Sequence, residues 1–106
     1  MHSVQVTPAE VADWRAGHAV HLLDVREPWE VQLVSFAEAQ TIPLAQLAQR
    51  WEEVPEDRRV VVVCHHGMRS LQATMFLRGR GLDNVWNLAG GIDAYAAQVD
   101  TTLARY

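Results

Sequence analysis

The chain has very little cysteine: Cys64 is the only one among its 106 residues. A disulfide within the chain is therefore impossible, and no second thiol is present to resolve an oxidised one. If Cys64 carries out redox or transfer chemistry, its product has to be handed to another molecule.

Long apolar runs and basic runs are absent as well. The longest uninterrupted apolar stretch, residues 60–64, is far too short to cross a bilayer. Residues 1–5 lack the charged start and apolar run of a signal peptide. The net charge is −4 at pH 7, which makes nucleic acid and anionic membranes poor candidates as partners. We therefore expect a cytoplasmic protein that binds neither.

The composition is that of a folded globular chain. Apolar residues make up 49% and charged residues 21% of the sequence, which is enough for a core and argues against disorder. The length suits one compact domain, and we expect residues 1–106 to form it.

Strand and helix signals alternate along the chain. Strands are expected over residues 4–6, 20–25, 40–42, 59–64 and 85–88. Helices are expected over residues 8–17, 28–33, 44–54, 70–80 and 92–99. The first helix should open with a capping box formed by Thr7 and Glu10. This alternation predicts an α/β fold with a mainly parallel sheet and helices on both faces.

The clearest strand contains four consecutive valines, residues 60–63. Such a run indicates a central strand that is covered on both faces. The helix that follows should present four side chains to the sheet: Leu71, Thr74, Met75 and Leu77.

Ligands of parallel sheets gather beyond the carboxyl ends of the strands, which here are residues 24–27 and residues 64–70. The second segment is a tight strand-to-helix loop, with Gly67 three positions after Cys64. Backbone N–H groups in such a loop can turn inward, and together with the helix N-terminus and Arg69 they favour an anion. A thiolate at Cys64 would be stabilised there, and the thiolate is the nucleophilic form.

Three other interpretations of this loop are weaker. A lone cysteine is often an inert core thiol, but the glycine, the arginine and the following helix argue against that here. Four residues separate Cys64 from Arg69, one fewer than in cysteine-dependent phosphatases, so the loop suits a sulfur atom better than a phosphoryl group. His65 and His66 are metal-ligand types, yet adjacent side chains in a tight loop seldom converge on one ion, and no CxxC or HxxxH spacing is present. We expect no metal.

Four segments, in this order, resemble the rhodanese homology family. They are residues 22–28 (LLDVREP), 41–44 (TIPL), 62–70 (VVCHHGMRS) and 84–95 (NVWNLAGGIDAY). The resemblance implies a five-stranded, mainly parallel sheet flanked by helices, a persulfide intermediate on Cys64 and ping-pong transfer. The donor would be thiosulfate or a persulfide, and the acceptor a thiol, cyanide or a sulfur-relay protein. No metal or organic cofactor is implied.

Roles for individual residues follow from the loop and from this resemblance. Cys64 would be the catalytic residue, and Arg69 would attract anionic donors. The persulfide would be held by the loop after the cysteine: His65, His66, Gly67, Met68, Arg69 and Ser70. Asp24 and Arg26 match a family pair near the active edge. We interpret them as a structural ion pair or as an anchor for the loop, because a buried Asp24 needs a partner.

The segment between the first two motifs departs from the family pattern. Glycine turns and a histidine are usual there, but residues 34–39 read VSFAEA. This departure keeps a second interpretation open, a non-catalytic rhodanese-like binding or sensing module. Such modules usually lack the cysteine that this chain retains as Cys64.

Overall fold

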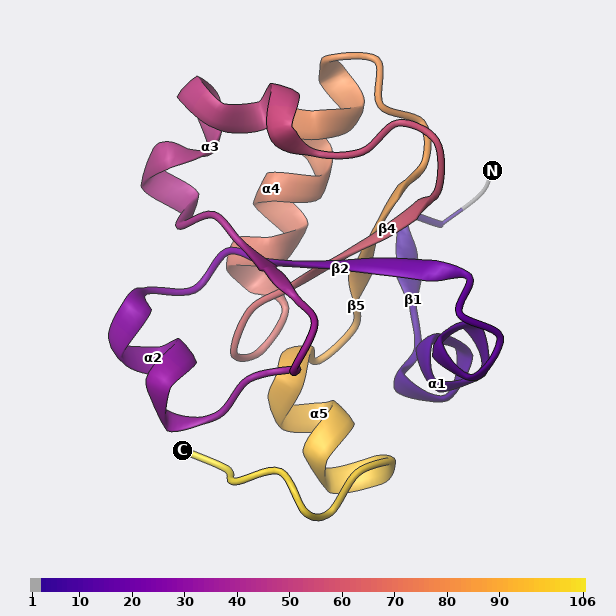
Figure 1. Cartoon of the computed structure of the whole chain (residues 1–106), viewed down its shortest axis with the longest axis vertical. Helices are drawn as coiled ribbons and strands as arrows, with labels where there is room; N and C mark the ends of the chain where they lie inside the picture. The colour runs from indigo at the N-terminus through magenta and orange to yellow at the C-terminus, as the bar shows by residue number, and fades with distance from the viewer. Residues whose placement is uncertain (1–2) are drawn as a thin grey trace.

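The structure is a computed structural model that describes residues 3–106; the first two residues of the N-terminal segment inspected for a signal peptide lie outside the described residues. Within residues 3–106, one five-stranded sheet runs in the order β1-β5-β4-β2-β3 (Figure 1). The strands are β1 (Gln5–Val6), β2 (Val20–Asp24), β3 (Gln40–Thr41), β4 (Arg59–Val63) and β5 (Val85–Leu88). The helices are α1 (Pro8–Ala16), α2 (Pro28–Leu33), α3 (Leu44–Arg50), α4 (Met68–Gly79) and α5 (Gly91–Gln98), with a short 3-10 turn, Trp51–Glu53, after α3. The expected α/β fold class is confirmed, and every pairing between these strands is parallel.

Strand β4 lies at the centre of the sheet and contributes side chains to the core on both faces. Val60, Val62 and Cys64 pack with α3 and α4 on one face. Val61 and Val63 alternate with them and pack with α1 and α5 on the other face. Because successive side chains of a strand point to opposite faces, the valine run fills two cores at once. Cys64 follows the last residue of β4. Its side chain therefore lies in the core beneath α4, at the edge of the sheet where the strands end.

Helix α1 begins with the capping box expected from the sequence. The Thr7 hydroxyl accepts a hydrogen bond from the Glu10 backbone N–H at 3.1 Å, and the Glu10 carboxylate accepts one from the Thr7 N–H at 3.0 Å. These bonds satisfy donors that the first helical turn otherwise leaves free. The helix expected over residues 44–54 is divided, because regular α-helix ends at Arg50 and the 3-10 turn follows.

Helix α4 buries a different stripe from the one expected. Met75 is 55% exposed, so its expected position against the sheet is wrong, and Ala73 is buried instead. The buried positions follow the i, i+3, i+4, i+7 spacing of one helical face: Ser70, Ala73, Thr74 and Leu77. Met75 lies about 100° around the helix from Thr74, which turns its side chain away from that stripe.

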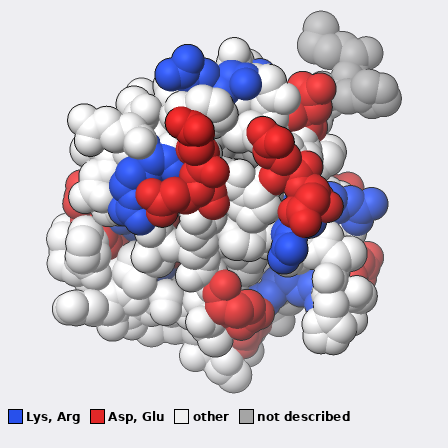
Figure 2. Space-filling view, turned by 45° about the horizontal axis from the view of Figure 1, so that its top comes forward, with Lys and Arg blue, Asp and Glu red and all other residues white. Residues whose placement is uncertain are grey.

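The surface mixes charges of both signs. Figure 2 shows basic side chains beside acidic ones on the face it presents. One exposed pair is Arg50–Glu53, whose Nε and Oε2 atoms are 2.9 Å apart, and pairs of this kind contribute little to stability because water screens them. No helix within residues 3–106 has the length and apolar character needed to cross a membrane.

The start of α5 is pressed against the loop that follows Cys64. The backbone N–H of Ile92 donates to the Cys64 carbonyl at 2.9 Å, and the N–H of Asp93 donates to the His65 carbonyl at 3.1 Å. Gly91 makes this approach with a φ of +67°. A Cβ atom at Gly91 would lie 2.3 Å from the His65 carbonyl oxygen, so only glycine fits.

The substitution Gly91→Ala should therefore destabilise the protein. We expect a loss of more than about 2 kcal/mol, because both the backbone conformation and the contact with two backbone carbonyls are unfavourable for alanine. The measurement is the free energy of unfolding in urea. Gly79→Ala is the matched control, since nothing lies within 4 Å of a Cβ at that position. Equal stabilities for the two variants would contradict the packing described for Gly91.

Candidate active site

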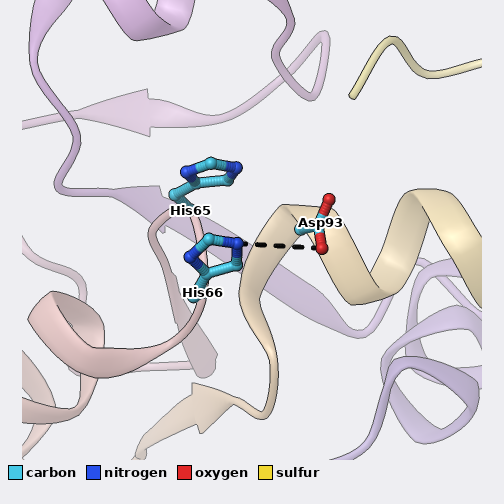
Figure 3. Close-up of side chains that lie close together, drawn as sticks. All are labelled: His65, His66 and Asp93. Atoms are coloured by element: carbon cyan, nitrogen blue, oxygen red, sulfur yellow. Dashed lines mark ion pairs between the residues drawn. The ribbon is translucent and has the colours of Figure 1, made fainter. Parts of the chain in front are cut away.

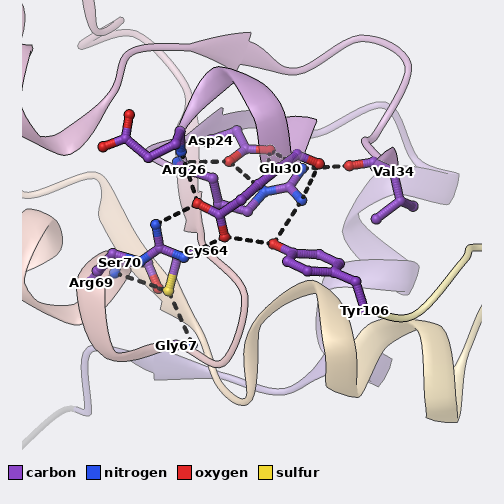
Figure 4. A network of polar contacts seen from close by, with 10 residues as sticks. Asp24, Arg26, Glu30, Val34, Cys64, Gly67, Arg69, Ser70 and Tyr106 are labelled. Atoms are coloured by element: carbon purple, nitrogen blue, oxygen red, sulfur yellow. Dashed lines mark hydrogen bonds and ion pairs between the residues drawn. The ribbon is translucent and has the colours of Figure 1, made fainter. Parts of the chain in front are cut away.

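The thiol of Cys64 lies at the end of β4 inside a ring of hydrogen-bond donors. Its Sγ atom accepts hydrogen bonds from the backbone N–H of Gly67 at 3.1 Å and of Ser70 at 3.3 Å (Figure 4). The Ser70 hydroxyl lies 3.2 Å from the same sulfur. Backbone N–H groups turned toward one point form an anion-binding concavity. The site can therefore hold a thiolate, with the Ser70 hydroxyl as a further donor.

Gly67 shapes this loop. It adopts a left-handed conformation with φ of +98° and forms the N-cap of α4, so the chain turns back over the sulfur and the helix begins with its N-terminus toward it. The Asn87 side-chain amide on β5 donates to the Gly67 carbonyl at 3.1 Å. A Cβ at Gly67 would lie 3.1 Å from the Gly90 nitrogen and 3.3 Å from the Leu88 carbonyl oxygen. The loop is thus held from β5 and from the turn before α5.

Arg69 faces Glu30 rather than an open cavity. Its two terminal nitrogens donate to the two carboxylate oxygens of Glu30, each at 2.7 Å (Figure 4). These bonds lower the pKa of Glu30 from 4.5 to about 2, and they raise the pKa of Arg69. The expectation that Arg69 attracts anionic donors stays a prediction, and this ion pair bears on it. The charge of Arg69 is matched by a carboxylate on α2, and any anionic donor would have to compete with that carboxylate.

Asp24 and Arg26 form a second, fully buried ion pair. The guanidinium Nη2 and the Asp24 Oδ2 are 2.6 Å apart, and both side chains have no exposed surface. Arg26 also donates to the backbone carbonyls of Val34 at 2.7 Å and Glu30 at 3.3 Å. These bonds tie both ends of α2 to the end of β2. The pair therefore takes the position of a structural anchor beside the loop.

The last residue of the chain reaches this network. The Tyr106 hydroxyl accepts from Arg26 Nη1 at 3.1 Å and donates to Glu30 Oε1 at 2.8 Å. Burial raises the pKa of Tyr106, so the hydroxyl keeps the proton that it donates to the carboxylate. The ring stacks on the imidazole of His65, with centroids 3.8 Å apart.

The two histidines after Cys64 are brought together with Asp93 of α5. One potential ligand atom from each of these residues lies within 4.8 Å of the other two. The imidazole rings are stacked, however, with centroids 3.9 Å apart and planes 20° from parallel. His66 Nε2 lies 3.8 Å from Asp93 Oδ2 (Figure 3), and both Asp93 oxygens accept from Arg105, at 2.9 and 3.2 Å. Ligand lone pairs of imidazole lie in the ring plane, so stacked rings of this kind do not converge on one ion.

The other loop residues named from the sequence differ in whether they contact the sulfur and in how exposed they are. Gly67 and Ser70 contact the sulfur, whereas the Met68 side chain is exposed to solvent. His65 is partly buried, and its Nε2 atom is buried with no hydrogen-bond partner among the described residues. His66 is exposed.

Sequence reasoning missed four residues that complete the site: Glu30, Asn87, Asp93 and Tyr106. Only Glu30 had a local signal, since it follows Pro28 at the start of α2, and its carboxylate accepts from the Glu27 N–H at 3.0 Å as a capping residue does. Tyr106 contacts Arg26 across 80 positions of sequence, and no local pattern reports such a contact.

The comparisons with known proteins agree with this geometry. A family model described as a rhodanese-like domain matches residues 7–98. This chain belongs to the rhodanese-like domain family.

Among the relatives of this rhodanese-like chain is a sulfurtransferase of Allochromatium vinosum. It is 40% identical over 77 residues, covering 73% of this chain and 72% of the relative. The probable adenylyltransferase/sulfurtransferase MoeZ of Mycobacterium tuberculosis is 35% identical over 104 residues, but the chain spans only 26% of its length. A solved rhodanese-related protein from Thermoplasma volcanium superposes with a TM-score of 0.84 at 33% identity, covering 90% of this chain and 92% of that one.

The segment that departs from the usual rhodanese pattern is held by its apolar side chains. Val34 and Phe36 are buried in the core shared by α1 and α5. The Phe36 ring packs edge-on against Tyr95, with centroids 5.0 Å apart, and the Val34 carbonyl accepts from Arg26. Buried side chains thus fix a segment in which the family usually has glycine turns.

The substitution Asp24→Asn should cost about 3–5 kcal/mol of unfolding free energy, because it leaves the Arg26 charge buried without its counter-ion. The measurement is a urea unfolding curve at neutral pH. Glu53→Gln breaks the exposed pair with Arg50 and is the control, with a far smaller expected loss because water screens an exposed pair. Similar losses in both variants would show that burial does not set the strength of the Asp24–Arg26 pair.

The ion pair of Glu30 should make stability depend on pH. Because the pKa of Glu30 falls from 4.5 to about 2 on folding, its contribution is complete above about pH 4.5 and is lost as the pH falls toward 2. At about 1.36 kcal/mol per unit the shift corresponds to about 3 kcal/mol. Arg69 is 35% exposed, so screening by water reduces the expected contribution to about 1–2 kcal/mol.

This pH dependence can be measured by comparing wild-type protein with Glu30→Gln. The difference in unfolding free energy should be largest near pH 6 and should shrink steadily below pH 4.5, since the wild-type carboxylate is then protonated as well. A difference that stays constant down to pH 2 would contradict the assignment.

Proposed function

We propose that this protein is a sulfurtransferase in which the Cys64 thiolate accepts a sulfane sulfur and passes it to a nucleophilic acceptor. The observation that carries the proposal is the convergence of the Gly67 and Ser70 N–H groups on Cys64 Sγ. Donors placed in advance around a sulfur stabilise the thiolate nucleophile. Rhodanese family membership and the sulfurtransferase names of relatives support the same class of reaction.

The first half of the reaction loads the cysteine. The Cys64 thiolate attacks the outer sulfur of thiosulfate or of a persulfide, and a new S–S bond forms at Sγ. The old S–S bond breaks, and sulfite or a thiolate leaves with the bonding electron pair. Cys64 then carries a persulfide whose outer sulfur is negatively charged, and the loop N–H groups are the donors available to hold it.

The second half of the reaction removes the outer sulfur from the Cys64 persulfide. A cyanide ion, a thiolate or an acceptor on a sulfur-relay protein attacks the outer sulfur, and Cys64 leaves as the thiolate that began the cycle. No electrons are gained or lost overall, so the site requires no redox cofactor. Because no second cysteine is available in the chain, the sulfur must leave to another molecule.

A binding or sensing module is the second candidate, and one observation favours it. Cys64 is only 1% exposed, whereas a nucleophile has to meet its substrate. A module would use the same surface to dock a partner and would not form a persulfide.

The deciding experiment is sulfur loading. Incubation with thiosulfate or a small organic persulfide should add one sulfur atom to the intact mass of the protein, and later addition of cyanide should release thiocyanate. Cys64→Ser should abolish both signals, because serine cannot form the persulfide. Met75→Ala, on the exposed side of α4, is the control and should keep them. Failure of wild-type protein to gain sulfur from any persulfide donor would reject the enzyme and leave the module.

A further inference from the structure

We propose that the C-terminal strap, residues 99–106, is a gate that closes the Cys64 site and must lift Tyr106 before a sulfur donor or acceptor can reach the thiol. Figure 1 shows this segment, in yellow, leaving α5 and running toward α2. The strap's role in regulating transfer rests on the proposed function, whereas its effect on access to Cys64 does not.

Tyr106 closes the site by bridging its two sides. On one side its ring stacks on His65, the residue next to Cys64, at 3.8 Å with planes 10° from parallel. On the other side its hydroxyl bonds to Glu30, which in turn holds Arg69 (Figure 4). The ring also lies edge-on to Trp29, with centroids 6.3 Å apart. One side chain therefore joins α2 to the loop that surrounds the sulfur.

The rest of the strap is fastened at separate points. Arg105 donates to both Asp93 oxygens, at 2.9 and 3.2 Å, in an ion pair whose arginine is largely exposed. Leu103 is partly buried against the core that contains Tyr95, and the N–H of Asp100 donates to the Tyr95 carbonyl at 3.0 Å. Beyond α5 the strap has turns but no regular helix or strand. Exposed ion pairs are weakened by water and salt, so the Arg105–Asp93 contact can break while the sheet stays folded.

Two features of the closed site indicate that it is not the only state the protein uses. Cys64 is 1% exposed, and any chemistry at its sulfur needs access. The Nε2 atom of His65 is buried under the stacked rings with no hydrogen-bond partner among residues 3–106, and an unpaired buried polar atom is unfavourable. Lifting Tyr106 would let water reach that nitrogen. The closed state thus carries a penalty that opening relieves.

The test measures access to the thiol without sulfur chemistry. Iodoacetamide reacts with thiols much faster than with other side chains, and Cys64 is the only cysteine in the chain, so the mass of the Cys64 peptide reports its alkylation. Under pseudo-first-order conditions at constant pH, Tyr106→Ala should be alkylated about tenfold faster than wild type or more, since the closed population no longer protects the sulfur. Raised salt should speed wild type by weakening Arg105–Asp93 and should leave Tyr106→Ala nearly unchanged.

Two further variants separate a gate from a general loss of structure. Tyr106→Phe keeps the stacked ring but loses both hydrogen bonds of the hydroxyl, so its rate should lie between those of wild type and Tyr106→Ala. Thr101→Ala changes an exposed side chain within the strap and should alkylate at the wild-type rate. Urea unfolding and far-UV circular dichroism check that each variant is folded.

Unchanged or slower alkylation in both folded Tyr106 variants would overturn the gate. If Tyr106→Ala proved unfolded, the rates of Tyr106→Phe and of wild type in raised salt would decide in the same way. Faster alkylation without any gain of sulfur would support the gate and reject the sulfurtransferase. Sulfur transfer by wild-type protein, together with equal alkylation rates in wild type and the Tyr106 variants, would support the sulfurtransferase and reject the gate.

Discussion

Two backbone N–H groups point at Cys64 Sγ because the chain between β4 and α4 turns back through a left-handed glycine, Gly67. At Gly91 the packing leaves no room for a side chain, and at Gly67 the left-handed φ and the tight approach to the turn before α5 disfavour one. Asn87 holds the turn from β5, and the first N–H groups of α5 hold the carbonyls of Cys64 and His65. The geometry around the sulfur is therefore imposed by the loop backbone together with a side chain of β5 and the first backbone N–H groups of α5.

Side-chain charges play a different part from the one that the loop sequence indicates. The two arginines near the sulfur are each bound to a carboxylate, Arg26 to Asp24 and Arg69 to Glu30. Their pairs cancel most of the charge and join α2 to β2 and to the loop. Stabilisation of a negative sulfur then depends on oriented N–H dipoles and the N-terminus of α4. An anionic donor of the kind proposed would have to compete with this bidentate carboxylate, because both present oxygen atoms to the same planar guanidinium.

Local patterns in the sequence were sufficient for the sheet and for the loop, and insufficient for what surrounds them. The valine run predicts a central strand because four β-branched residues in a row need two buried faces, and the cap at Thr7 predicts the start of α1 because it is a local hydrogen-bond pattern. The prediction for Met75 is wrong because the apolar side chains of this helix fit two overlapping stripes, and the sequence does not reveal which of the two meets the sheet. Asp93 and Tyr106 reach the loop only after α5 has packed, so their position depends on the tertiary fold. Glu30 carried a signal for a helix cap that concealed its second role, as the partner of Arg69.

What the burial of Cys64 implies for reactions at its sulfur depends on which part of the protein covers that sulfur. If only the loop backbone covered the sulfur, opening would break the hydrogen bonds that the Gly67 and Ser70 N–H groups donate to Sγ. In the proposed gate the ring of Tyr106 is part of that cover, and it is held by one face stacked on His65, an edge contact with Trp29 and two hydrogen bonds to groups that also have other partners. Arg26 keeps Asp24 when Tyr106 leaves, and Glu30 keeps Arg69. Contacts of Tyr106 can therefore break while the hydrogen bonds from the loop backbone to Sγ persist, which is the order of local stabilities that the proposed transfer at Cys64 requires.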